Sequence, residues 1–489
     1  MKRRSFLLSL GFLLAPNIGG ASSATSLRPR ARPLAFQDKS LSRLIAERKL
    51  AGEVGLCCVT LDQGKLVEQK NANSAFAPAS VLKIFTALYA LDVLGKDFSY
   101  ETRVVHDGQL RDGIIHGNLY LIGQGDPSFD TDMMVSLVKS ITEKGIRGVT
   151  GQFYYCDGLS SNIPYIDGGQ RPQAGYNPSV GGLNLNFNRI FFEWRKTGNK
   201  TQVSLDARGR THRPKVKSIS LDVSAEQTQT YVYRSDATSE RWTVAKRSLR
   251  KDGGVWLPVR QPGRYFAEVF SFLAKDMGLA LPDPKPHHLP KVPVHKIAVH
   301  KSAPLFSIVR YMLKHSMNLS AECLGRSATQ ALGGDTSNLR ASAMRMQEWA
   351  TIWLGLKDAV FVDHSGLGEA SRISAKSMCA GLVKANKLWP SFMPLLRSIR
   401  PRDINGEIDE TVPSSIKAKT GTLYFVSSLA GYMESEGKPP MAFAIFSQNL
   451  EKRKIWKANN PLERPSGSKT WNRTARSLQH SLLTRWRLL

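Results

Sequence analysis

Apolar residues recur at helical spacing in three parts of this chain. The first pattern follows Ser80 and covers residues 81–94. The second runs over 305–324 with an interruption at 316–318, and the third closes the chain over 470–486. We therefore predict a buried helix that opens at Ser80, a pair of helices joined by a turn at 316–318, and a final helix.

Strand patterns lie at both ends of the chain. Residues 54–61 and 65–69 flank the turn residues 62–64, which predicts a hairpin. Near the other end, residues 426–432 and 441–447 predict two more strands joined by a polar turn.

Between residues 101 and 288 the pattern changes to short alternating stretches separated by glycine and asparagine. Examples are 114–123, 201–203 and 218–223. This part of the chain is therefore predicted to be rich in strands.

Composition places the chain among ordinary globular proteins. It has 489 residues and a hydrophobic content of 42%, enough for two or three domains, and its formal net charge is +28. This charge indicates either a solvated cationic surface or attraction to anionic polymers or lipid headgroups of the cell envelope, and both interpretations stay open.

The first residues read as an export signal. Basic residues at 2–4 precede an apolar run over 6–15 and small residues over 19–24, so residues 1–24 are predicted to be a cleavable signal peptide that directs the protein to the periplasm. Arg3-Arg4 fits a twin-arginine signal as well as a general secretory one. No other apolar run approaches the ~20 residues of a membrane-spanning helix. Export and the lack of a recognition motif argue against nucleic acid as a partner.

Cysteine and histidine spacing favours neither a disulfide framework nor a metal site. The five cysteines are an odd number and are predicted to pack in the core, with Cys57 and Cys58 pointing to opposite faces of a strand. The histidines at 287, 288, 295 and 300 lie in a proline-rich stretch that reads as a connector. No metal or other cofactor is predicted.

Three short motifs carry the candidate chemistry. They are Ser80-Val81-Leu82-Lys83, Ser316-Met317-Asn318 and Lys419-Thr420-Gly421. Each alone has a plain structural explanation as a helix cap, a capping box or a turn. The ordered set of three in fitting contexts is much harder to obtain by chance.

The first motif holds a nucleophile and a base. Residues three apart share one face of a helix, so the amine of Lys83 can reach the hydroxyl of Ser80. For Lys83 to accept a proton its pKa must fall, and burial together with a second cation such as Lys419 would lower it. The helix N-terminus offers N–H groups to a developing negative charge.

The other two motifs would complete a cleft. The turn at 316–318 can aim the Ser316 hydroxyl and the Asn318 amide into it. Lys419 and Thr420 can bind a carboxylate, and Gly421 lets a ligand backbone lie along the strand, which is recognition of a peptide at a sheet edge.

Together these residues resemble the low-molecular-mass, class C penicillin-binding proteins, a family of D-alanyl-D-alanine carboxypeptidases that also act as endopeptidases. The resemblance extends to Gly125-Asp126-Pro127, the stretch from Tyr176 to Asn188, Ala321-Glu322 and Asp363-His364-Ser365-Gly366-Leu367. It implies an α/β (α+β) fold, in which an antiparallel sheet flanked by helices forms a transpeptidase or β-lactamase-like domain interrupted by a large strand-rich insertion.

The resemblance also implies roles for the motif residues. Ser80 would attack the carbonyl of the penultimate D-alanine of a peptidoglycan stem peptide, with Lys83 as the base. Ser316 would return the proton to the leaving amine, and Asn318 would organise Lys83 and the substrate amide. β-Lactams would acylate the same serine.

Substrate binding is implied for the last motif. Lys419 and Thr420 would hold the terminal carboxylate beside Gly421, and the N–H groups of Ser80 and Thr422 would form the oxyanion hole.

Because the three motifs must meet, the catalytic domain is predicted to be discontinuous, formed by residues 33–100 and 289–489, with 101–288 inserted. Two other functions stay open at this point. A serine β-lactamase would need an efficient deacylating base, and no glutamate stands in a defensible position. A non-enzymatic peptidoglycan-binding protein would keep the motifs only for ligand capture.

Overall fold

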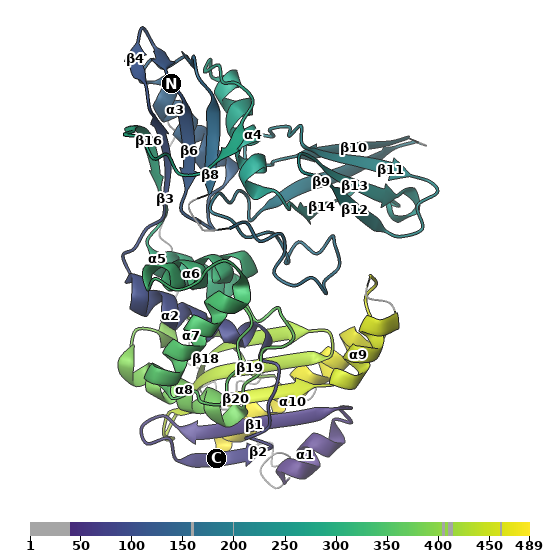
Figure 1. Ribbon diagram of the computed structural model, residues 1–489. Helices are drawn as coiled ribbons and strands as arrows, with labels where there is room; N and C mark the ends of the chain where they lie inside the picture. Colours follow the sequence, from purple (N-terminus) through teal and green to yellow (C-terminus); the bar gives the residue numbers. More distant parts are fainter. Residues whose placement is uncertain (1–39, 158–160, 199, 403–405, 409–413, 460–461) are drawn as a thin grey trace, which may run out of the picture.

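The computed structural model describes residues 40–157, 161–198, 200–402, 406–408, 414–459 and 462–489. The predicted signal peptide over 1–24 lies outside these ranges. Two parts are stacked on one another (Figure 1), and we call them the main part, which contains both ends of the described chain, and the insertion, which the chain enters after α2 and leaves before α5.

A six-stranded antiparallel sheet forms the centre of the main part. Its strand order is β17-β18-β19-β20-β1-β2. The strands are β1 (Glu53–Thr60), β2 (Leu66–Lys70), β17 (Arg397–Ser398), β18 (Ser414–Leu423), β19 (Val426–Ser435) and β20 (Met441–Gln448). Since β1 pairs with β20, the first hairpin of the chain and its last strands complete one sheet.

Helices cover both faces of this sheet (Figure 1). One face carries the 3-10 helix η2 (Ala79–Leu82), α2 (Lys83–Leu94), α5 (Leu305–His315), α6 (Asn318–Ala331), α7 (Leu339–Leu354) and α8 (Ala375–Leu388). The other carries α1 (Leu41–Glu47) and α10 (Ser468–Leu488), while α9 (Leu450–Asn459) follows β20. The predicted helices after Ser80, on both sides of 316–318 and at the end of the chain are confirmed.

Burial on two faces explains the apolar pattern of the central strands. Every residue of β20 is buried, and on β1 Cys57 packs toward α8 while Cys58 packs in the core beneath α10. The five cysteines are all buried, and none of them forms a disulfide bond. Leu478, Leu482 and Trp486 of α10 are buried against the sheet, so the apolar face of this basic helix is already covered.

The insertion is built on a five-stranded sheet of order β15-β8-β6-β3-β16, with α3 (Thr131–Thr142) and α4 (Pro262–Asp276) packed against it. Its strands are β3 (Glu101–His106), β6 (Leu119–Gly123), β8 (Phe153–Asp157), β15 (Lys285–His287) and β16 (His295–Lys301). A small sheet joins β4 (Gln109–Arg111), β5 (Ile114–His116) and β7 (Gly148–Val149). Two more three-stranded sheets contain β9 (Arg189–Thr197), β10 (Lys200–Asp206) and β14 (Gly253–Pro258), and β11 (Ile219–Ser224), β12 (Tyr231–Ser235) and β13 (Glu240–Ala245). The prediction of a strand-rich insertion is confirmed.

The end of the insertion lies later than the position inferred from the sequence. β16 pairs with β3 along its length, so residues 295–301 belong to the insertion's sheet, and a boundary after Lys301 suits the pairing better than one at 289. Three of the histidines thought to lie in a connector stand on strands β15 and β16. The chain's exit and entry points touch, because the backbone N–H of Ser302 donates to the carbonyl of Tyr100 at 2.9 Å.

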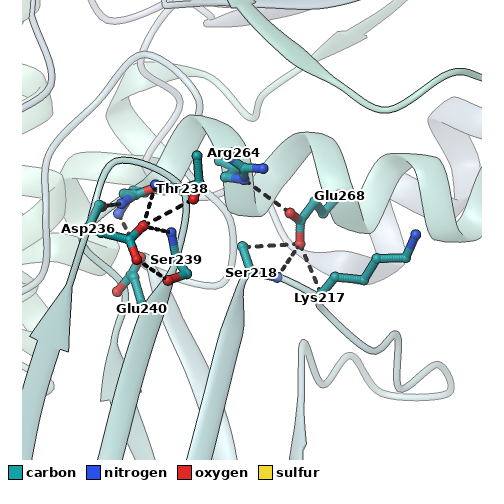
Figure 2. Close-up of polar contacts among 9 residues, drawn as sticks. Lys217, Ser218, Asp236, Thr238, Ser239, Glu240, Arg264 and Glu268 are labelled. Atoms are coloured by element: carbon teal, nitrogen blue, oxygen red, sulfur yellow. Dashed lines mark hydrogen bonds and ion pairs between the residues drawn. The ribbon is translucent and has the colours of Figure 1, made fainter.

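Two glutamates fix the sheet of β11, β12 and β13 to α4. Glu240 on β13 accepts hydrogen bonds from the backbone N–H groups of Arg260 and Gln261 at the start of α4, each at 2.9 Å. Reciprocally, Glu268 on α4 accepts from the backbone N–H groups of Lys217 and Ser218, each at 3.0 Å, as Figure 2 shows. Glu240 is 1% exposed, and burial raises its pKa while the N–H donors oppose that rise.

We expect Glu240→Gln to lower the midpoint of thermal unfolding. Glutamine offers one acceptor oxygen and an NH₂ group, so either the hydroxyl of Tyr233 or the backbone N–H of Gln261 loses the oxygen that accepts from it, at a cost of about 1–3 kcal/mol. The exposed Glu226→Gln is the matched control and should leave the midpoint unchanged. Equal midpoints for the two variants, measured by calorimetry, would contradict this role of Glu240.

Candidate active site

The nucleophile candidate Ser80 lies in a tight turn at the start of α2. Ala79 adopts a left-handed conformation (φ 47°), and η2 leads directly into α2, which ends at Leu94 with Gly95 at φ 82°. Gly366 packs closely against this turn, since an added Cβ at residue 366 would lie 1.9 Å from the carbonyl oxygen of Ala79. Ser80 is therefore presented by a backbone that its neighbours constrain.

Lys83 is the centre of the polar network. Its side chain is fully buried, and Nζ lies 2.9 Å from Ser80 Oγ, 2.7 Å from Asn318 Oδ1 and 2.6 Å from the carbonyl oxygen of Ser365. Burial lowers the pKa of Lys83 to about 7, against the opposing effect of the carboxylates of Asp363 and Glu322. An amine with this pKa exchanges a proton near neutral pH.

The second motif occupies the turn between α5 and α6, as its sequence predicted. Ser316 ends α5 in the left-handed conformation (φ 58°), and Asn318 is the first residue of α6. Asn318 also donates from Nδ2 to the carbonyl oxygen of Tyr176 at 2.8 Å, so the insertion contacts the motif directly.

The third motif stands on β18 beside the second. Lys419 Nζ donates to Ser316 Oγ at 2.8 Å and to the carbonyl oxygen of Thr420 at 2.7 Å. Burial and the neighbouring Lys83 lower the pKa of Lys419 well below its ordinary range. In the register of the described strands, β17 pairs with β18 only at Lys417 and Ala418, so no described strand pairs with residues 419–423 on this side.

The structure gives a packing reason for a glycine at position 421, in addition to the ligand-binding reason inferred from the sequence. An added Cβ would lie 2.8 Å from the carbonyl oxygen of Pro78 and 3.0 Å from the backbone nitrogen of Ser80. The space above Gly421 is thus filled by the protein's own nucleophile turn, and the glycine is needed for β18 to pack against that turn.

A cleft of about 410 Å3 opens onto part of this network, and Lys83, Lys419, Thr420 and Gly421 do not line it. Its lining includes Ser80, Ser316, Asn318 and Thr422 from the motif regions and Gln170 and Tyr176 from the insertion, together with Tyr424, Arg453, Arg464 and Asn472. The sequence motifs did not predict the last four residues of this lining, because these residues lie after β18 in segments that contain no recognisable motif. A larger cavity of about 500 Å3, lined by Phe425, Trp456 and Trp471 among others, contains none of the motif residues.

In the described parts of the chain, no three His, Cys, Asp or Glu side chains gather in a way that would hold a metal ion. The three motifs are instead connected by hydrogen bonds through Lys83, Asn318, Ser316 and Lys419, which is an arrangement suited to serine acylation.

Comparison with known proteins agrees with this arrangement. The profile of the D-Ala-D-Ala carboxypeptidase 3 (S13) family matches residues 37–465. A D-alanyl-D-alanine carboxypeptidase from an Actinomadura species is 25% identical, covering 91% of this chain and 86% of the relative. The D-alanyl-D-alanine carboxypeptidase DacB from Haemophilus influenzae is 22% identical, over 84% and 88% of the two chains.

Solved structures share the fold. The crystal structure of penicillin binding protein 4 (dacB) from Haemophilus influenzae has a TM-score of 0.72 and 20% identity, and covers 91% of this chain and 99% of that one. A complex of that protein with a β-lactam has a TM-score of 0.70. The fold inferred from the motifs is thereby confirmed.

We expect Gly421→Ala to slow acylation of Ser80 by a fluorescent penicillin roughly 10- to 100-fold, since a misplacement of about 1 Å near a reacting group can cost ~10²-fold. Stopped-flow measurement of the acylation rate tests this. Gly148→Ala is the control, because its added Cβ would meet only ordinary contacts at 3.4 Å and beyond. Equal rates for both variants would show that β18 does not constrain the nucleophile turn.

Proposed function

The chain belongs to the D-Ala-D-Ala carboxypeptidase 3 (S13) family of serine peptidases, and we propose that it cleaves the terminal D-alanine from peptidoglycan stem peptides through an acyl-enzyme on Ser80. The observation that carries these roles is the set of three hydrogen-bond partners around the buried Nζ of Lys83.

The three partners of Lys83 Nζ suit both of its protonation states. A protonated Lys83 donates to the carbonyl oxygens of Asn318 and Ser365 and to Ser80 Oγ. A neutral amine, with two N–H groups and one lone pair, can keep both carbonyl partners and accept from the Ser80 hydroxyl. The pKa of about 7 makes the neutral form available near neutral pH, and this form is oriented to take the Ser80 proton.

Acylation then proceeds as follows. Lys83 Nζ takes the proton from Ser80 Oγ, which attacks the carbonyl carbon of the penultimate D-alanine. The backbone N–H groups of Ser80 and Thr422 stabilise the oxyanion. The proton held by Lys83 then passes through the Ser316 hydroxyl to the nitrogen of the leaving D-alanine, so Lys83 is neutral again and Ser316 keeps its hydroxyl. The C–N bond breaks, and water later hydrolyses the ester.

Lys419 serves the substrate's terminal carboxylate. Its amine is buried beside Ser316 and next to Thr420 on the open edge of β18, and a bound carboxylate would favour its charged form again, offsetting the effect of burial. The same steps cleave a D-Ala-diamino acid cross-link when the leaving amine belongs to a diamino acid, which is the endopeptidase reaction.

β-Lactams would acylate Ser80 and remain attached. Among the cleft-lining side chains that the structure describes, none carries a carboxyl group that could activate water. A long-lived penicilloyl-enzyme is therefore proposed over β-lactamase turnover.

Periplasmic action belongs to the same proposal. Peptidoglycan lies outside the cytoplasm, and residues 1–24 have the composition of an export signal. None of the helices in the described parts of the chain combines the length and apolar content that crossing a bilayer requires.

The acylation rate should rise with pH through a midpoint near 7. Only neutral Lys83 accepts the Ser80 proton, and below its pKa of about 7 the amine is protonated, so the rate falls tenfold per pH unit on the acid side. Stopped-flow acylation by a penicillin between pH 5 and pH 9 measures this limb at a fixed ionic strength. A rate that is flat from pH 5 to pH 9 would refute Lys83 as the base.

Thr422→Pro should slow hydrolysis of a D-Ala-D-Ala peptide far more than Thr422→Ala. Proline removes the backbone N–H, and loss of one oxyanion donor costs ~10²–10³ in turnover, whereas alanine keeps the N–H and removes only an exposed side chain. Circular dichroism shows whether both variants fold. Similar losses in the two folded variants would remove Thr422 from the oxyanion hole, and Ser80→Ala should be inactive throughout.

A further inference from the structure

We propose that Glu322 is a positioning residue of this reaction. It holds the backbone of residues 363–366 so that the carbonyl oxygen of Ser365 accepts a hydrogen bond from Lys83 Nζ. The inference rests on the proposed role of Lys83 as the base and adds a residue to which none of the three motifs assigns a task.

The contacts run in a chain from α6 to Lys83. The two carboxylate oxygens of Glu322 accept hydrogen bonds from the backbone N–H of His364 at 3.0 Å and of Ser365 at 2.9 Å. The carbonyl oxygen of Ser365 then accepts from Lys83 Nζ at 2.6 Å. Since Asn318 stands one turn before Glu322 on the same helix, α6 sets two of the three partners of Lys83.

The loop that Glu322 holds is fixed on its other sides as well. Asp363 accepts from the backbone N–H of Gly366 at 2.7 Å, and His364 Nε2 lies 2.8 Å from Ser342 Oγ. The His364 ring fits only because residue 325 is glycine, where an added Cβ would lie 2.1 Å from Nδ1. The carbonyl of Ser365 therefore has one well-defined position.

Glu322 is placed to act through the loop and not on the substrate. Its side chain is fully buried, it is absent from the cleft lining, and both oxygens are engaged by backbone N–H groups. Burial and the neighbouring Asp363 raise the pKa of Glu322 to about 8, while the hydrogen bonds from Ser365 and His364 and the nearby Lys83 favour its ionised form. Together with Asp363, Glu322 is one of the two carboxyl groups that raise the pKa of Lys83, and its complete burial away from the cleft lining keeps it from a water in the cleft.

Charge gives a second link between the two residues. In their ionised forms Asp363 and Glu322 favour protonated Lys83, and Lys83 in turn favours the ionised form of Glu322. His364 is neutral in this setting, because burial and Arg326 lower its pKa to about 3. Glu322→Gln removes this mutual effect and should therefore lower the pKa of Lys83.

The test compares Glu322→Gln with Glu240→Gln, a matched control. Both glutamates are buried, and each accepts backbone N–H groups of two successive residues, but Glu240 lies in the insertion on β13. Acylation by a fluorescent penicillin is followed across pH, with the reactive fraction counted from the label bound at completion. The acylation rate constant is separated from the initial binding constant by varying the penicillin concentration.

We expect Glu322→Gln to lower the acylation rate constant about tenfold or more with little change in initial binding, because a displaced Ser365 carbonyl misaligns the base. The acid limb should also move to lower pH. Glu240→Gln should be less stable than wild type but keep both the rate and the limb. An unchanged rate and limb in the reactive fraction of Glu322→Gln would overturn the proposal.

Glu322→Asp decides the matter if the glutamine variant does not fold. Aspartate keeps the charge but is one methylene too short for both N–H groups, so the rate should fall while the acid limb stays near its wild-type midpoint. A wild-type rate in the folded aspartate variant would contradict positioning. Locating the penicillin label in the wild-type protein tests the proposed function separately from the role of Glu322. Label on a residue other than Ser80 would refute the proposed acyl-enzyme, independently of the results for the Glu322 variants.

Discussion

The arrangement of the active site depends on one buried amine, the Nζ group of Lys83. Lys83 is removed from water completely, and the cost of burying a charged ammonium is what brings its pKa down to about 7. Its three partners are two carbonyl oxygens and one hydroxyl, a set that a neutral amine satisfies without leaving any polar atom unpaired. Burial of a lysine normally destabilises a protein. Here it provides a base at neutral pH beside the Ser80 hydroxyl that this base must activate.

This constraint explains why distant segments must meet. The partners of Lys83 come from η2, from the start of α6 and from the loop at 363–366, while Lys419 reaches Ser316 from β18. The first hairpin pairs with β20, and Tyr100 and Ser302 join the points where the chain leaves for the insertion and returns. A large insertion can therefore be accommodated without disturbing the cleft, and its Tyr176 carbonyl contributes to holding Asn318.

Much of this could be predicted from the sequence, because its signals are local. The helical spacing after Ser80, the break at 316–318 and the strands around Lys419 each reflect one element, and the structure agrees with them. The roles assigned to the motif residues stay proposals, although their side chains do come together. What could not be predicted depends on contacts between segments. Gly421 is small because the nucleophile turn packs on it, and β16 belongs to the insertion because it pairs with β3. No local sequence pattern predicts that Glu322 accepts hydrogen bonds from the backbone N–H groups of residues 364 and 365.

The most direct test of the central claim is the titration of Lys83 itself. NMR of protein labelled with carbon-13 at the lysine Cε, with the signal assigned by its absence in Lys83→Met, gives the pKa without reference to any substrate. A midpoint near 7 is expected from the burial and contacts of Nζ. A midpoint near the ordinary lysine value of 10.5 would show that Lys83 is charged at neutral pH and cannot serve as the base.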